Sequence, residues 1–129
     1  MDDGVRREVA GNGKIIAFVE EWSNTGEEYE YEYVVIDTGE ESQGAAIRKQ
    51  VDRVKALGWD AVNPETVDGS VVLGSSDLNA RIKVEALQEF LREWDGGDGI
   101  PLEQRAALKI KSQISSPGSL VLVTLTSLE

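Results

Sequence analysis

The chain has 129 residues and a formal net charge of −11; 40% of the residues are hydrophobic, 29% are charged, and neither cysteine nor histidine occurs. This length suits one domain, and this composition is typical of a folded globular protein. The missing histidine and cysteine exclude Ser-His-Asp and Cys-His catalysis, disulfides and zinc–thiolate sites, so a metal would have to bind oxygen ligands. The negative charge disfavours direct nucleic-acid binding, which depends on clustered lysine and arginine.

Membrane segments are not expected either. No stretch approaches the roughly 18 apolar residues of a spanning helix, and the first residues lack the apolar segment of a secretory signal. We therefore expect a soluble, cytoplasmic protein. Residues 1–127 are expected to form a single domain, and 128–129 could be a cloning scar.

A β-meander of three antiparallel strands is predicted for the first third of the chain. Asn12 and Gly13 are typical of a tight turn, and strand-like runs over 5–10 and 14–22 flank them. A second turn then leads into a third strand that ends near Asp37.

The third strand, 28–37, alternates glutamate with tyrosine and ends in aliphatic residues. Successive side chains of a strand point to opposite faces. One face carries Tyr29, Tyr31, Tyr33 and Val35, and the other carries Glu28, Glu30, Glu32, Val34 and Ile36. Because burying unpaired glutamates is costly, we expect the tyrosine face to be packed and the glutamates to face solvent. Val34 and Ile36 add apolar groups to the glutamate face, so we expect that face to be covered at its far end and open at its near end.

A helix is predicted over 41–57. Thr38 and Glu41 fit a capping box, and Gly58 is placed to end the helix. Its apolar stripe consists of Ile47, Val51, Val54 and Leu57. We expect this stripe to pack against the tyrosine face of strand 28–37.

In the middle of the chain, from Trp59 on, the pattern predicts one or two short strands ending near Leu73 and then a second amphipathic helix. Ser76 would cap this helix, and Gly96 would end it. Its apolar positions are Leu78, Ile82, Leu87, Phe90, Leu91 and Trp94. Trp22, Trp59 and Trp94 each fall at the end of a predicted element, where aromatic residues commonly close a core.

The last third leaves one element open. Residues 102–115 fit a helix or a strand, and the helix is favoured because Pro101 suits a first turn and good helix formers follow. Residues 120–127 form a largely apolar strand, which indicates a central position covered on both faces. The fold class is α+β: an antiparallel sheet of about five or six strands, with two or three helices packed mainly on one face. The strand order does not follow from the sequence.

An acidic block suggests the function. Between Glu20 and Glu41 the chain has many acidic residues and neither lysine nor arginine. We expect a non-enzymatic interaction module that binds a basic protein surface, such as an inhibitor, an immunity-type protein, a nucleic-acid mimic or an assembly subunit. The candidate partner-binding residues are Glu20, Glu21, Glu27, Glu28, Glu30 and Glu32. The other interpretation of the acidic block is that it only keeps the protein soluble.

A second hypothesis is a small-ligand-binding protein or a carboxylate-based hydrolase. Its ligand would bind at the mouth of a pocket between sheet and helix. The candidate ligand-binding residues are Tyr29, Tyr31, Glu20 and Glu30. A homo-oligomer is a third hypothesis. The sequence predicts no catalytic residue, no cofactor and no metal site.

Overall fold

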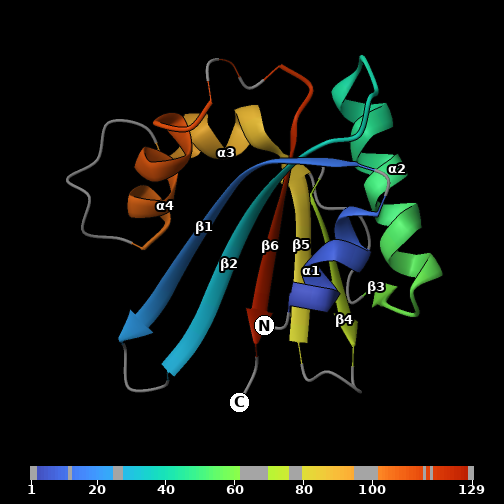
Figure 1. Ribbon diagram of the computed structural model, residues 1–129, viewed down its shortest axis with the longest axis horizontal. Helices are drawn as coiled ribbons and strands as arrows, with labels where there is room; N and C mark the ends of the chain where they lie inside the picture. The colour runs from blue at the N-terminus through green and yellow to red at the C-terminus, as the bar shows by residue number, and fades with distance from the viewer. Residues whose placement is uncertain are drawn as a thin grey trace.

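In the part of the chain that the structure describes, six strands form one antiparallel sheet with helices on both of its faces (Figure 1). The computed structural model describes residues 3–11, 13–24, 28–61, 70–75, 80–94, 102–114, 116 and 118–127. The elements are α1 (Asp3–Ala10), β1 (Lys14–Asn24), β2 (Glu28–Asp37), α2 (Gln43–Ala56), β3 (Asp60–Ala61), β4 (Val71–Ser75), β5 (Ala80–Ala86), α3 (Leu87–Glu93), α4 (Leu102–Lys111) and β6 (Val121–Ser127). Within these ranges, no helix is both long and apolar enough to cross a membrane.

The last strand of the chain lies in the middle of the sheet. The strand order is β1-β2-β6-β5-β4-β3, and every neighbouring pair is antiparallel. Val34 of β2 is opposite Val123 of β6, which is opposite Val84 of β5. The predicted α+β class, with five or six antiparallel strands, is confirmed, as is the central position of strand 120–127.

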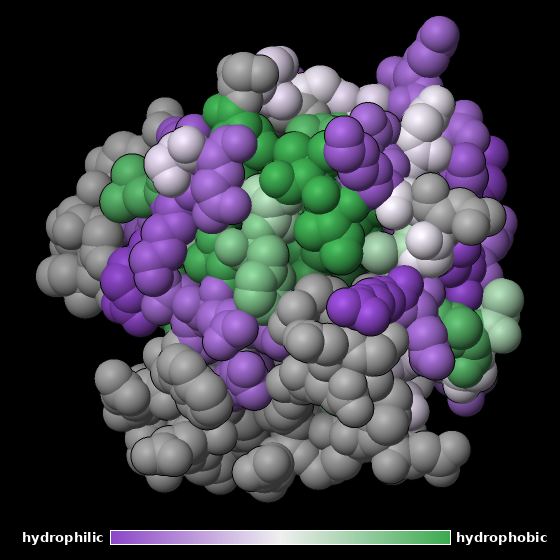
Figure 2. Space-filling model, viewed as in Figure 1, coloured by the Kyte–Doolittle hydropathy of each residue, from purple (hydrophilic) through white to green (hydrophobic). Residues whose placement is uncertain are grey.

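Each face of the sheet carries its own apolar core. On one face α1 and α2 cover Val34, Ile36, Val123 and Leu125 with residues that include Val9, Val51 and Val54. On the other face α3 and α4 cover Val19, Tyr33, Val35 and Leu122 with residues that include Leu87, Phe90, Ala106 and Ile110. In the view of Figure 1, α1 lies in front of the sheet, and Figure 2 shows apolar side chains in the middle of this face with hydrophilic ones to the left and right of them.

The helices differ from the expectation in number and in placement. Two or three were expected mainly on one face, whereas the described residues form four, which are divided between both faces. The tyrosine face of β2 is packed as predicted, since Tyr33 is only 2% exposed, but it contacts α3 and α4 and not the helix that follows it. The reason is that Val34 and Ile36 give β2 a second apolar face, and α2 covers that one.

The first predicted strand is wrong, because residues 3–10 form helix α1. Gly11 has φ 55°, and its N–H donates to the Arg7 carbonyl at 2.8 Å, which is a helix end and not a hairpin turn. Gln50 of α2 holds α1 in place, because its Nε2 donates a hydrogen bond to the Val9 carbonyl at 2.7 Å. The N-terminal meander therefore reduces to the β1–β2 hairpin.

The helix predicted over 41–57 is confirmed as α2, but its N-cap is Ser42 and not Thr38. The Ser42 hydroxyl accepts from the Ala45 N–H at 3.2 Å, while Thr38 is buried at the end of β2. Gly58 takes φ 99° just beyond the helix, as its predicted role requires. Of the short strands expected to end near Leu73, β4 contains this residue and β3 precedes it.

The second predicted helix is half wrong. Its first part is strand β5, in which Ala80, Ile82 and Val84 are buried on one face, and only Leu87–Glu93 is helical. The open segment after Pro101 is a helix, α4, as favoured. The strand alternation in 80–86 competes with the helical spacing of Leu78 and Ile82, which are four residues apart, and pairing with both β4 and β6 decides for the strand.

Candidate functional site

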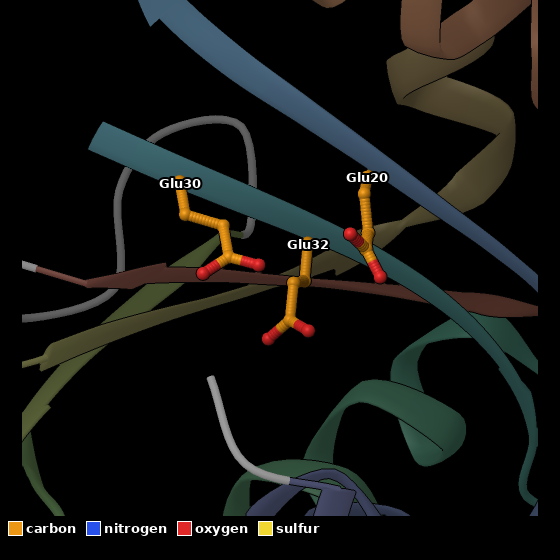
Figure 3. Close-up of side chains that lie close together, drawn as sticks. All are labelled: Glu20, Glu30 and Glu32. Atoms are coloured by element: carbon orange, nitrogen blue, oxygen red, sulfur yellow. The ribbon is translucent and has the colours of Figure 1, made fainter. Parts of the chain in front are cut away.

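Three glutamates of the β1–β2 hairpin point into one space on the face that α1 and α2 cover (Figure 3). Glu20 is directly opposite Glu32 in the pairing, and Glu30 follows on the same face. A carboxylate oxygen of each lies within 4.8 Å of the others. Glu20 is exposed, Glu30 is half-buried and Glu32 is only 1% exposed. The expectation that the glutamates of β2 all face solvent is therefore wrong for Glu32.

This carboxylate cluster has the chemistry of a hard-cation ligand set. Carboxylate oxygens are the ligands that Ca²⁺ and Mg²⁺ prefer, and Ca²⁺ takes about six to eight oxygens. Glu20, Glu30 and Glu32 could supply part of such a set. The cluster concentrates negative charge at one place on the hairpin.

Glu21 points to the opposite face and is not available at the surface. Its side chain is 9% exposed; Lys109 Nζ lies 2.7 Å from Oε1, and Arg105 Nε lies 3.4 Å from Oε2. The acidic block of the sequence is thus divided between the two faces of the sheet. Glu27 and the side chains of Glu28 and Tyr29 lie outside the described part of the chain.

A cavity of about 270 Å³ lies between the sheet and the helices α3 and α4. Its aromatic lining consists of Tyr31, Tyr33, Phe90 and Trp94, and its polar lining consists of Lys83, Glu85, Glu93, Glu103, Thr124 and Thr126. We call it the aromatic–acidic cavity. Tyr33 and Phe90 form its buried base, with ring centroids 5.7 Å apart, whereas Tyr31 and Trp94 are half-buried.

Strand register explains the hollow. On this face Tyr31 is opposite Thr126, and in the next row Tyr33 is opposite Thr124, which is opposite Lys83. The threonines of β6 are short and stand between the rings of β2 and the long side chain of β5. A trough therefore runs along the central strand β6, and Phe90 of α3 and Trp94, just after that helix, line it as well.

Among the described residues that line this cavity, acidic side chains outnumber basic ones. Lys83 Nζ lies 3.6 Å from Glu85 Oε2, so the lysine charge is offset by a carboxylate that is itself 9% exposed. Among the described residues, no ion pair joins Glu93 or Glu103 to a cation. Burial raises the pKa of the Tyr33 phenol well above its ordinary value of 10.0, and Glu103, Tyr31, Glu21 and Glu85 raise it further. The base of the cavity is therefore a neutral hydroxyl in a negative potential.

The ligand-binding residues proposed from the sequence are separated by the structure. Tyr31 lines the aromatic–acidic cavity, while Glu20 and Glu30 lie on the opposite face. The acidic residues of the cavity were missed because they come from β5, α3 and α4. A strand assignment for 80–86 could have found Glu85, because it places Lys83 and Glu85 on the face opposite the buried Ile82 and Val84.

Comparisons with known proteins add no relative: the chain matches no family model, no curated protein and no solved structure.

Proposed function

We propose that this protein is a non-catalytic binding module whose ligand enters the aromatic–acidic cavity. The observation that carries this proposal is the lining, in which four aromatic side chains share one hollow with carboxylates and hydroxyl groups. Small-molecule sites are typically concave and largely apolar, with a few polar groups that orient the ligand. At about 270 Å³ the cavity is near the small end of such sites, which favours a ligand of a few heavy atoms.

The base of the site is packed into the core. Tyr33 is 2% exposed and packs on the Phe90 ring, and both belong to the core beneath α3 and α4. A rigid site loses little conformational freedom when a ligand binds, so more of the contact energy is left for affinity. These features support binding by a fixed surface.

Several features argue against catalysis at this place. The chain has no histidine and no cysteine, which are the usual general base and thiol nucleophile. The Tyr33 phenol has an ordinary pKa of 10.0, which burial raises further, so it is protonated near neutral pH and is not a base there. Glu85 already faces the ammonium group of Lys83. The polar groups are better suited to orienting a ligand than to moving protons.

Three probes of nearly equal shape test the proposal: choline, its neutral carbon isostere 3,3-dimethylbutan-1-ol, and the anion 3,3-dimethylbutanoate. Each is titrated to about 10 mM, where even a binding free energy of about 3 kcal/mol is detectable. We expect at least one probe to shift the backbone amide signals of Tyr31, Trp94 and Thr126 saturably in heteronuclear NMR spectra.

A cavity-filling variant provides the control. Thr126→Trp places an aromatic ring, which strands accept well, inside the cavity and should abolish binding. Leu108→Trp adds the same side chain at a position that is 60% exposed and should leave binding unchanged. If no probe binds, or if binding survives in Thr126→Trp, the cavity is not a ligand site.

A second candidate function is the binding of a basic protein surface, as expected from the sequence. It is favoured by the carboxylate cluster, because Glu20 and Glu30 are at least partly open to solvent and lie beside Glu32. A lysine-rich peptide should then bind more weakly to the double variant Glu20→Gln/Glu30→Gln than to Glu8→Gln/Glu41→Gln, which removes equal charge elsewhere. Equal affinities in a fluorescence anisotropy titration would rule this candidate out.

A further inference from the structure

Building on the proposed function, we infer that the ligand of the aromatic–acidic cavity is an organic cation that carries an alkylated ammonium group. The inference names the chemical class of the ligand, which the presence of a cavity alone does not. It depends on three observations: the open aromatic rings, the carboxylates on the two helices, and the absence of an uncompensated cation among the described lining residues.

The aromatic rings at the mouth supply the first contact. Tyr31 of β2 and Trp94 at the end of α3 are half-buried, so each keeps ring surface that a ligand can reach. The face of an aromatic ring carries negative charge density and attracts cations, most strongly for tryptophan. Alkylated ammonium groups suit such a surface because they are weakly hydrated and lose little on leaving water.

Charge complementarity selects the sign of the ligand. Glu93 of α3 and Glu103 of α4 line the cavity, and neither forms an ion pair with a described cation. Lys83 is the one cation among the described lining residues, and Glu85 offsets it at 3.6 Å. A bound cation would compensate the carboxylates, whereas an anion would be repelled by them.

The base of the cavity agrees with this assignment. The raised pKa of the Tyr33 phenol reflects burial first, and then the negative potential from Glu103 and Glu85 among others. The hydroxyl therefore remains neutral and can accept or donate a hydrogen bond without opposing a cation. Thr124 and Thr126 add hydroxyl groups along the floor, which suit a ligand with a polar end beside its ammonium group.

The three isosteric probes separate charge from shape. We expect choline to bind at least about threefold to tenfold more tightly than 3,3-dimethylbutan-1-ol, and 3,3-dimethylbutanoate to bind most weakly. Equal or tighter binding of the neutral or anionic probe would overturn the inference and leave the proposed function standing. Failure of all three probes would instead overturn the proposed function.

Variants that remove charge test whether the cavity carboxylates are the source of the affinity for choline. Glu93→Gln/Glu103→Gln should weaken choline binding about threefold or more and leave the neutral isostere unchanged, because both glutamines keep the shape of the wall. Glu8→Gln/Glu41→Gln removes the same charge from exposed positions outside the cavity and should change neither affinity. Equal losses of choline affinity in both variants would mean that only the overall negative charge attracts the probe, and would count against the inference.

A final titration distinguishes two sources of the same cationic group. Acetyl-trimethyllysine methylamide presents the group as a modified protein side chain, whereas choline presents it as a free small molecule. Tighter binding of choline identifies a small-molecule ligand, and tighter binding of the lysine derivative identifies a side chain of a partner. Either result supports an alkylated ammonium ligand, and loss of choline binding in Trp94→Leu, with the fold intact by circular dichroism, is required in both cases.

Discussion

Lys109 Nζ lies 2.7 Å from Glu21 Oε1, and this ion pair joins α4 to the edge strand β1. Arg105 approaches the other oxygen of the same carboxylate at 3.4 Å. The Glu21 side chain is 9% exposed while Lys109 is 55% exposed, so a buried anion is satisfied by cations that reach in from the surface. The glutamate that the sequence offers as a partner-binding residue is thus an internal contact that holds a helix in place.

Replacing Glu21 should therefore destabilise the protein. We expect Glu21→Ala to lower the free energy of unfolding by about 1–3 kcal/mol, because the hydrogen-bonded carboxylate is mostly buried. Urea denaturation measures the loss. A double-mutant cycle with Lys109→Ala should give a coupling energy of at least about 0.5 kcal/mol. Additive losses in the cycle would show that the pair at 2.7 Å contributes nothing specific.

The neighbouring Glu20 should respond in the opposite direction. It is directly opposite Glu32 in the β1–β2 pair, and like charges opposite each other destabilise a sheet. Glu20→Gln should raise the free energy of unfolding by about 0.2–1 kcal/mol at low ionic strength. The gain should shrink at about 1 M salt, where charges are screened within about 3 Å. Glu21→Gln, with the same change in charge, is the control and should lose stability; a loss in Glu20→Gln as well would contradict repulsion within the carboxylate cluster.

Local patterns in the sequence were sufficient for some elements. Strand β2, helix α2 and strand β6 follow from alternation or helical spacing, because each keeps one pattern through most of its length. Residues 5–10 failed because a six-residue run without a clear period fits either state, and the helix depends on contacts of Val9 and Ala10 with α2. The segment 80–86 failed because its strand is stabilised by β4 and β6, which are distant in sequence.

The candidate site was less accessible to sequence reasoning than the fold. Alternation in β2 places Tyr31 and Glu30 on opposite faces, yet both were proposed for one pocket. The cavity itself depends on non-local pairing, since β6 inserts between β2 and β5 and brings its short threonines beside Tyr31 and Tyr33. No local pattern indicates that Glu103 of α4 approaches the same hollow as Glu93 of α3.

The short helix α3 should prove essential to the second core. Leu87 and Phe90 are 0% and 3% exposed, so Leu87→Ala and Phe90→Ala should each lower the free energy of unfolding by about 2–5 kcal/mol. Leu108→Ala, at a position on α4 that is 60% exposed, should cost less than about 0.5 kcal/mol. Chemical denaturation of the three variants tests this, and a loss under about 1 kcal/mol at both buried positions would mean that α3 is packed differently.

Tyr33 should make the protein sensitive to alkali. Burial raises the pKa of its phenol above the ordinary value of 10.0, which applies to the unfolded chain, so the folded state holds the phenolic proton more tightly. Below pH 10 both states are protonated and the stabilising effect is fully present; above it the unfolded state releases the proton first, and stability falls by up to about 1.4 kcal/mol per pH unit. Tyr33→Phe removes this proton and should lower stability at pH 8 only slightly, because the ring that packs on Phe90 is kept. Urea denaturation between pH 8 and 11 should therefore give a shallower alkaline decline for the variant, and parallel curves would show that the Tyr33 hydroxyl is open to water.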